Sequence, residues 1–84
     1  MPYIKQEDRT CFDGINTFVD VPDNAGELNY LLTVIWKAYF EFHGGRYQQM
    51  NDIIGALEGC KLEFYRRLIT PYEDTKIKEN GDVY

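Results

Sequence analysis

One apolar run with a clear start and a clear stop constrains this chain more than any other feature. Asn24 is a good helix N-cap, and Glu27, three residues later, completes a capping-box pattern. Apolar residues then repeat mainly at steps of three and four, and two further rings widen the stripe: Leu28, Leu31, Leu32, Ile35, Trp36, Ala38, Tyr39, Phe40 and Phe42. Gly44 and Gly45 end the run after His43, because glycine favours the left-handed cap position. The sequence therefore predicts a central helix over residues 24–43 that is apolar over most of its circumference.

A second apolar run predicts a long helix over residues 46–70. The residues expected on its buried face recur at helical spacing: Tyr47, Met50, Ile53, Ile54, Leu57, Cys60, Phe64 and Leu68. Gly55 and Gly59 stand four residues apart, and small residues at that spacing let another helix approach closely. Short connections favour antiparallel neighbours, so we expect this helix to pack antiparallel to the central one.

A new helix start is predicted at Pro71. Thr70 is a suitable cap, proline suits the first helical position, and Glu73 stands three residues after the cap. We therefore expect a separate short helix over residues 71–79, which leaves the long helix at an angle and ends at Asn80-Gly81.

The N-terminal part of the chain carries a third helical stripe. Its apolar residues follow helical spacing over residues 6–19: Cys11, Phe12, Ile15, Phe18 and Val19. Pro22 disfavours a helical residue before it and ends the stripe. Residues 2–4 and 82–84 have the β-branched and aromatic character of extended segments. The prediction is an all-α fold: a small bundle of three main helices plus a short C-terminal helix, with extended termini, in a single domain over residues 1–84.

The charge and the hydropathy of the chain argue against two kinds of partner, nucleic acids and membranes. Nine Lys and Arg residues against fourteen Asp and Glu residues leave a net charge of −5 at pH 7. A general nucleic-acid binder needs surplus cations to neutralise phosphates, so we expect no nucleic-acid partner. No apolar run approaches the roughly 18 residues of a membrane span, and no signal-peptide core follows Met1. We therefore expect a cytoplasmic protein without membrane contact.

The cysteines and the single histidine give no metal motif. Cys11 and Cys60 both fall on predicted apolar faces, which predicts reduced core thiols in a cytosolic protein. His43 is expected to interact with the C-terminal dipole of the central helix rather than to act in catalysis. A zinc site would need carboxylates to complete its ligand shell. We expect neither a metal nor a cofactor.

The sequence holds no motif of an enzyme. The chain has no serine, hence no Gly-x-Ser-x-Gly elbow, and it has no phosphate loop or dinucleotide fingerprint. A Cys60–His43 pair stays open on sequence alone, although a thiol on a buried face is inert. We therefore expect no enzyme and no catalytic residue.

Both ends of the chain and its centre carry recognisable motifs. These are residues 1–9 (MPYIKQEDR), 26–30 (GELNY), 61–67 (KLEFYRR), 71–74 (PYED), 76–77 (KI) and 79–84 (ENGDVY). Together they resemble a family of small uncharacterised proteins encoded by bacteriophages and bacteria. The resemblance implies a small soluble protein of phage origin, and it brings no catalytic residues.

Tyrosines beside charged residues are the remaining candidates for a site. Seven of the 84 residues are tyrosine, whose apolar ring and wet hydroxyl suit interfaces and ligand clefts. We predict a ligand-binding patch of six residues: Asn29, Tyr30, Tyr65, Arg66, Tyr72 and Glu73. Free N–H groups at the start of the central helix can receive an anion, and an arginine fork with aromatic rings can hold a nucleotide-like one. Antiparallel packing and the bend at Pro71 are expected to bring the six together.

Two local alternatives stand beside this patch. Glu63 precedes Arg66 and Arg67 by three and four residues, so it can pair with either and satisfy the charge without a ligand. The second alternative is that the six residues only lock the C-terminal helix onto the bundle.

The sequence favours a non-enzymatic binding protein of phage type, which captures either a host defence component or a small nucleotide signal. The alternative is a structural or assembly protein that acts by self-association. In both cases we expect a homo-oligomer, because the apolar central helix, the glycine pair and the apolar termini exceed what one small bundle hides. The expected location is the cytoplasm of the bacterial host.

Overall fold

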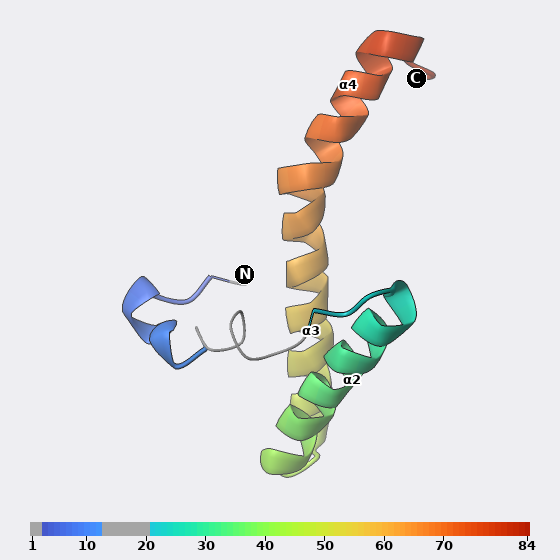
Figure 1. Ribbon diagram of the computed structural model, residues 1–84. Coiled ribbons are helices and arrows are strands. Elements are labelled where there is room, and N and C mark those ends of the chain that lie inside the picture. The colour runs from blue at the N-terminus through green and yellow to red at the C-terminus, as the bar shows by residue number, and fades with distance from the viewer. Residues whose placement is uncertain (1–2, 13–20) are drawn as a thin grey trace. The chain divides into compact units, whose positions relative to one another are not determined.

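The computed structural model describes residues 3–12 and 21–84, and every regular element within these ranges is helical (Figure 1). Two short 3-10 turns, η1 (Gln6–Asp8) and η2 (Thr10–Phe12), precede α2 (Ala25–Phe42). A second helical run consists of α3 (Tyr47–Phe64), the π-helical segment η3 (Tyr65–Ile69) and α4 (Thr70–Asn80). The predicted all-α class is confirmed for the described ranges.

The described chain divides into two compact units, residues 3–53 and residues 54–84. The first unit holds η1, η2, α2 and the beginning of α3, and the second holds the rest of α3 with η3 and α4. The expectation of a single domain over residues 1–84 stays a prediction.

Both ends of α2 are set by local signals. Asn24 accepts a hydrogen bond from the Glu27 backbone N–H at 2.9 Å, and its side-chain amide donates to the Glu27 carboxylate at 2.9 Å. At the other end His43 is the C-cap, and the residues that follow, Gly44 and Gly45, have positive φ angles of 99° and 61°. The predicted start and stop of this helix are confirmed, because caps are decided within a few residues.

Alanine substitutions at two glycines are expected to change the free energy of unfolding in opposite directions. Gly45 has a φ of +61°, and a Cβ there would lie 3.2 Å from the Phe40 ring. We expect Gly45→Ala to lower the free energy of unfolding by about 1–2 kcal/mol. Gly55 lies inside α3 with nothing within 4 Å of its Cβ position, so Gly55→Ala is expected to raise that free energy by up to about 1 kcal/mol. Urea unfolding followed by circular dichroism measures both, and two changes of equal sign would contradict this geometry.

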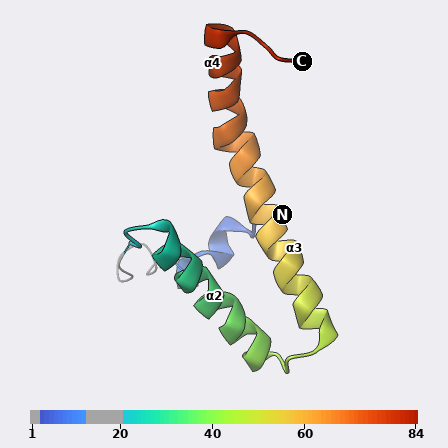
Figure 2. The same cartoon turned by 90° about the vertical axis from the view of Figure 1, so that its right-hand side faces the viewer.

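The predicted break at Pro71 is wrong. Ile69 and Thr70 both have helical backbone angles, with φ of −74° and −58°, and the helix runs on from α3 into α4 (Figure 2). Within η3 the Thr70 backbone N–H donates to the Tyr65 carbonyl, five residues back instead of four. This wider turn makes room for the Pro71 ring, which in a regular α-helix strikes the carbonyl four residues earlier. A π-helical turn therefore replaces the expected bend, and α4 continues the long helix.

The N-terminal helix predicted over residues 6–19 is absent from the part of it that the structure describes. Residues 6–12 form only the two 3-10 turns, and residues 13–19 lie outside the described residues. An amphipathic stripe forms a stable helix only where its apolar face is packed, and Phe12 is 57% exposed. In the described residues, the predicted bundle of three main helices plus a short C-terminal one is thus reduced to α2 and one long helical run.

The chain ends agree better with prediction. Residues 3–5 and 81–84 carry no helix, as expected for extended termini. In the last segment the Tyr84 backbone N–H donates to the Asp82 carboxylate at 2.9 Å, and the Val83 side chain is 92% exposed.

No described residue is buried, which overturns the predicted core. Side chains predicted to face inward are largely exposed, for example Ile35 on α2 and Leu68 on η3. The half-buried residues of α2 are Leu31, Thr33, Trp36 and Phe40. Cys60, predicted as a core thiol, is a free and exposed cysteine, while the Cys11 side chain lies outside the described residues. A helix face is buried only where another surface covers it, and apolar periodicity does not specify the cover.

Candidate functional site

An exposed apolar stripe runs along α2 in the unit formed by residues 3–53. It consists of five side chains spaced four, three, four and three residues apart: Leu28, Leu32, Ile35, Tyr39 and Phe42. This alternation keeps them on one face of a helix, and each is at least 40% exposed. We call this set the α2 stripe. A contiguous exposed row of large apolar side chains is typical of a protein-interaction surface.

A hydrogen-bonded cluster joins α2 to the beginning of α3 beside this stripe. The Tyr39 hydroxyl donates to one Asp52 carboxylate oxygen at 2.9 Å, and the Gln48 amide donates to the other at 2.8 Å. The hydrogen bond to Asp52 raises the pKa of Tyr39, because it holds the phenol proton, and the negative carboxylate disfavours a phenolate in the same direction. The His43 ring contacts both the Tyr39 and the Phe42 ring, at centroid distances of 4.5 and 5.0 Å. The cluster fixes the α2–α3 turn.

The raised pKa of Tyr39 predicts a tyrosine that ionises above the ordinary value of about 10. Because its folded-state pKa exceeds the unfolded one, the neutral phenol stabilises the fold below the unfolded pKa, and this contribution is lost as the pH rises through the folded pKa. Ultraviolet titration is expected to show a late-ionising tyrosine that Tyr39→Phe removes and Tyr30→Phe leaves in place. A late phase that survives Tyr39→Phe would contradict the hydrogen bond.

The predicted site residues Asn29 and Tyr30 lie near the start of α2, and both are exposed. Tyr30 lines a shallow hollow of about 480 Å³ together with Val21, Pro22, Asp23, Glu27 and Leu31. The Asn24 side chain already satisfies the Glu27 N–H of this helix start. Since two carboxylates line the hollow, it suits a cation or a neutral polar group better than a phosphate.

The other four predicted residues lie on the helical run of residues 54–84. Tyr65 and Arg66 belong to η3, Tyr72 and Glu73 belong to the first turn of α4, and all four are exposed. The Lys76 ammonium lies 5.6 Å from the centroid of the Tyr72 ring, within the range of a cation–π contact. Because Asn29 and Tyr30 belong to the other unit, the grouping of all six in one site stays a prediction.

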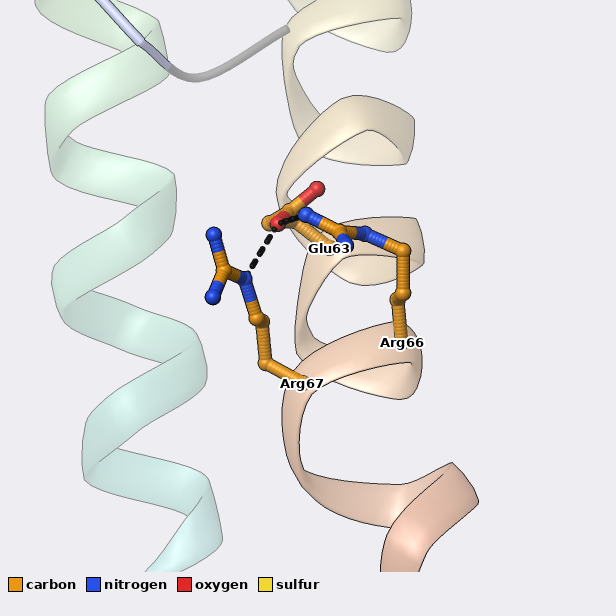
Figure 3. A network of polar contacts seen from close by, with 3 residues as sticks. All are labelled: Glu63, Arg66 and Arg67. Atoms are coloured by element: carbon orange, nitrogen blue, oxygen red, sulfur yellow. Dashed lines mark hydrogen bonds and ion pairs between the residues drawn. The ribbon is translucent and has the colours of Figure 1, made fainter.

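Arg66 is engaged by a carboxylate of its own helix (Figure 3). Arg66 Nη2 and Arg67 Nε both donate to Oε1 of Glu63, the latter at 3.0 Å. The Glu63 side chain is 17% exposed, against 63% and 62% for the two arginines. The predicted pairing at three and four residues is confirmed. One carboxylate thus holds two guanidinium groups, and an anionic ligand at Arg66 would compete with it.

Glu73 also lines a second hollow, which lies along α4. Its other walls are Lys76, Ile77, Asn80 and the chain end over residues 81–84, and its volume is about 340 Å³. Gly81, with a φ of 88°, turns the chain end away from the helix. The hollow is open to solvent and is lined by one helix and one extended segment.

Two of the contacts at these surfaces are not among the sequence predictions. The Gln48–Asp52 and Tyr72–Lys76 pairs both have the i, i+4 spacing that brings side chains together on a helix, and this spacing is the signal that would have found them. The Tyr39–Asp52 bond joins different helices and has no such signal.

The part of the chain that the structure describes holds no cluster of metal-ligating side chains and no candidate membrane-spanning helix. No three His, Cys, Asp or Glu side chains in residues 3–12 and 21–84 are grouped so as to hold a metal ion. In the same ranges no helix combines the length and the apolarity that crossing a bilayer requires.

Comparison with known proteins finds one family model, whose description assigns no activity. The sequence matches, over residues 1–83, the family described as "Domain of unknown function (DUF6899)". No curated protein and no solved structure matches the chain.

Proposed function

Because this chain belongs to the DUF6899 family, whose description assigns no activity, we propose its function from its own surface: it is a non-enzymatic binding protein that works as a homo-oligomer. The observation that carries the proposal is that no described side chain is buried, while α2 and α3 carry rows of large exposed apolar side chains. Exposed apolar rows are unfavourable in water, and in working proteins they are covered by other protein surfaces.

The shape of the α2 stripe is evidence that the partner is a protein. Its five side chains extend over four helical turns as a line, which is the footprint of a helix that packs against another helix or lies in a groove. The net charge of −5 favours a partner whose rim is basic. Following the resemblance to phage proteins in residues 1–9 and 79–84, we assign this partner to a bacterial host defence system.

Self-association is tested by light scattering. At tens of micromolar we expect a mass at least twice the 9.9 kDa of the chain. The melting temperature is also expected to rise with protein concentration, because association stabilises the folded state by mass action. A clean 9.9 kDa monomer at that concentration would overturn the homo-oligomer.

Partner capture is tested with a charged stripe variant and a matched control. Leu32→Glu combined with Ile35→Glu places two charges in the α2 stripe, at residues that are 43% and 54% exposed, whereas Val34→Glu places one charge off the stripe at an apolar residue that is 44% exposed. Host proteins that co-purify with the tagged chain are expected to be lost with the double variant and retained with the control. Proteins retained by both variants would show that the stripe is not the binding surface.

A second candidate, capture of a small nucleotide, is favoured by exposed rings and cations on the run of residues 54–84. Tyr65 and Tyr72 offer faces on which a base can stack, and Arg66 and Lys76 supply positive charge. Thermal melting with a panel of nucleotides tests this, because a ligand at 100 times its Kd adds about 2.7 kcal/mol of stability.

The double variant Arg66→Ala/Tyr72→Ala separates binding from structure. Both side chains are exposed, so we expect the melting temperature without ligand to change little and the nucleotide-dependent gain to disappear. If instead the melting temperature and the helicity of the variant fall and its nucleotide binding is unchanged, these residues only stabilise the helix.

A further inference from the structure

A second row on the long helix repeats the spacing of the α2 stripe but contains one charge. In the unit of residues 54–84, four residues follow one another at steps of three, four and three: Ile54, Leu57, Lys61 and Phe64. These are the core positions of a heptad repeat. The apolar three are 68%, 37% and 53% exposed, and the Lys61 side chain is 59% exposed. We call these four residues the α3 seam.

We propose that the α3 seam is the contact through which two copies of this chain pair as antiparallel helices, with the two-fold axis crossing the seam at the height of residue 59. The inference rests on the self-association proposed above and names its surface and orientation. In this register Ile54 lies opposite Phe64 of the second copy, and Leu57 lies opposite Lys61 of the second copy. Each of these layers occurs twice by symmetry, so the whole seam is used.

Lys61 decides between the two orientations. Parallel pairing puts equivalent core positions face to face, so the two Lys61 ammonium groups would meet inside the contact. Antiparallel pairing puts each Lys61 against Leu57 and next to the flanking Glu58 of the second copy. Lys61 and Glu58 already pair within one chain at 3.3 Å. Two lysines and two glutamates then alternate around the axis, so the charges of the antiparallel contact are complementary.

The π-helical segment limits the length of the seam. The Thr70-to-Tyr65 hydrogen bond spans five residues, which places one additional residue in that turn. A three-and-four repeat therefore cannot stay on the same face beyond η3. The contact is confined to about three turns, which fits a dimer that forms and dissociates readily rather than a permanent one.

Charge substitution on and off the seam tests the surface. Phe64 is 53% exposed in the seam, and Leu62 is 58% exposed on another face of the same helix. We expect Phe64→Glu to raise the dimer dissociation constant at least about 30-fold and Leu62→Glu to leave it within about threefold. Far-ultraviolet circular dichroism checks that both variants stay helical. If the two substitutions weaken association equally, or if neither does, the seam is not the contact.

Distances between spin labels test the orientation. In a background without other cysteines, labels on Cys60 lie one residue from the proposed axis, so their separation is expected to be below about 20 Å. Labels on Lys78→Cys lie 19 residues from the axis, which predicts a separation of about 60 Å at 1.5 Å of rise per residue. A short distance at both positions would show a parallel pair and overturn the inference, as would a long distance at Cys60. In either case an oligomeric mass by light scattering would leave the proposed self-association standing, whereas a monomeric mass defeats both.

Discussion

Replacing Pro71 by alanine is expected to raise the free energy of unfolding by up to about 3 kcal/mol. Proline has no N–H to donate to the Arg67 carbonyl, and it disfavours the helical angles that Thr70 nevertheless has, with φ −58° and ψ −49°. Alanine removes both penalties. The π-helical turn of η3 is then no longer required, and the five-residue hydrogen bond from Thr70 to Tyr65 should revert to the four-residue spacing of an α-helix.

Denaturant unfolding and backbone chemical shifts measure the two parts of this expectation. Pro71→Ala should move the unfolding midpoint upward and shift the Cα resonances of residues 65–69. Thr70→Ala is the matched control, because it changes the neighbouring residue and retains the proline. If the control alters residues 65–69 as much as Pro71→Ala does, the proline is not the cause of the π turn.

Replacing Phe40 by alanine is expected to lower the free energy of unfolding by about 2–3 kcal/mol, somewhat less than the cost of truncating a fully buried phenylalanine. The Phe40 ring is half-buried and lies 3.2 Å from the Cβ position of Gly45, so it packs directly on the turn between α2 and α3. The Gly45 N–H also donates to the Phe40 carbonyl at 2.8 Å. In Phe40→Ala the turn keeps its backbone hydrogen bond but loses the aromatic ring that packs on it.

Phe42→Ala is the control for this substitution. It removes the same side chain two residues later on α2, where the ring is 85% exposed. We expect the control to change the unfolding free energy by less than about 0.5 kcal/mol at a concentration where the chain is monomeric. Equal losses for Phe40→Ala and Phe42→Ala, measured by urea unfolding, would contradict the packing of Phe40 on the turn.

The bounds of α2 can be predicted from the sequence because the groups that set them are close neighbours. Asn24 and Glu27 satisfy each other at the start, and Gly44 and Gly45 take the positive φ angles at the end. The pairing of Glu63 with Arg66 is predictable for the same reason, since three residues separate the partners on one helix.

The continuity of the long helix at Pro71 is not predictable from these local rules. Thr70, Pro71 and Glu73 satisfy the pattern of a helix start, and the same residues are compatible with a helix that passes through a π turn. The choice depends on which carbonyl the Thr70 N–H reaches, and no residue type in the motif specifies that.

Apolar periodicity predicts which face of a helix is apolar, but not which surface packs against that face. Trp36 and Phe40 are half-buried, whereas Ile35 and Phe42, residues of the same apolar character on the same helix, are exposed. The Tyr39–Asp52 bond is not predictable for a related reason, because its partners stand thirteen positions apart on different helices. Among the six predicted site residues, sequence spacing relates those within one helix and leaves the relation between the two units open.

The absence of buried side chains among the described residues has a calorimetric consequence. A globular chain gains about 12–15 cal/mol/K of heat capacity per residue on unfolding, because buried apolar surface becomes hydrated. A chain whose large side chains already meet water, such as Tyr30 at 72% exposure and Phe42 at 85%, gains less. The apolar surface that stays hydrated in the single chain is covered only on association, which therefore has a negative change in heat capacity. Dilution calorimetry at several temperatures therefore registers how much helix surface a second copy of the chain covers.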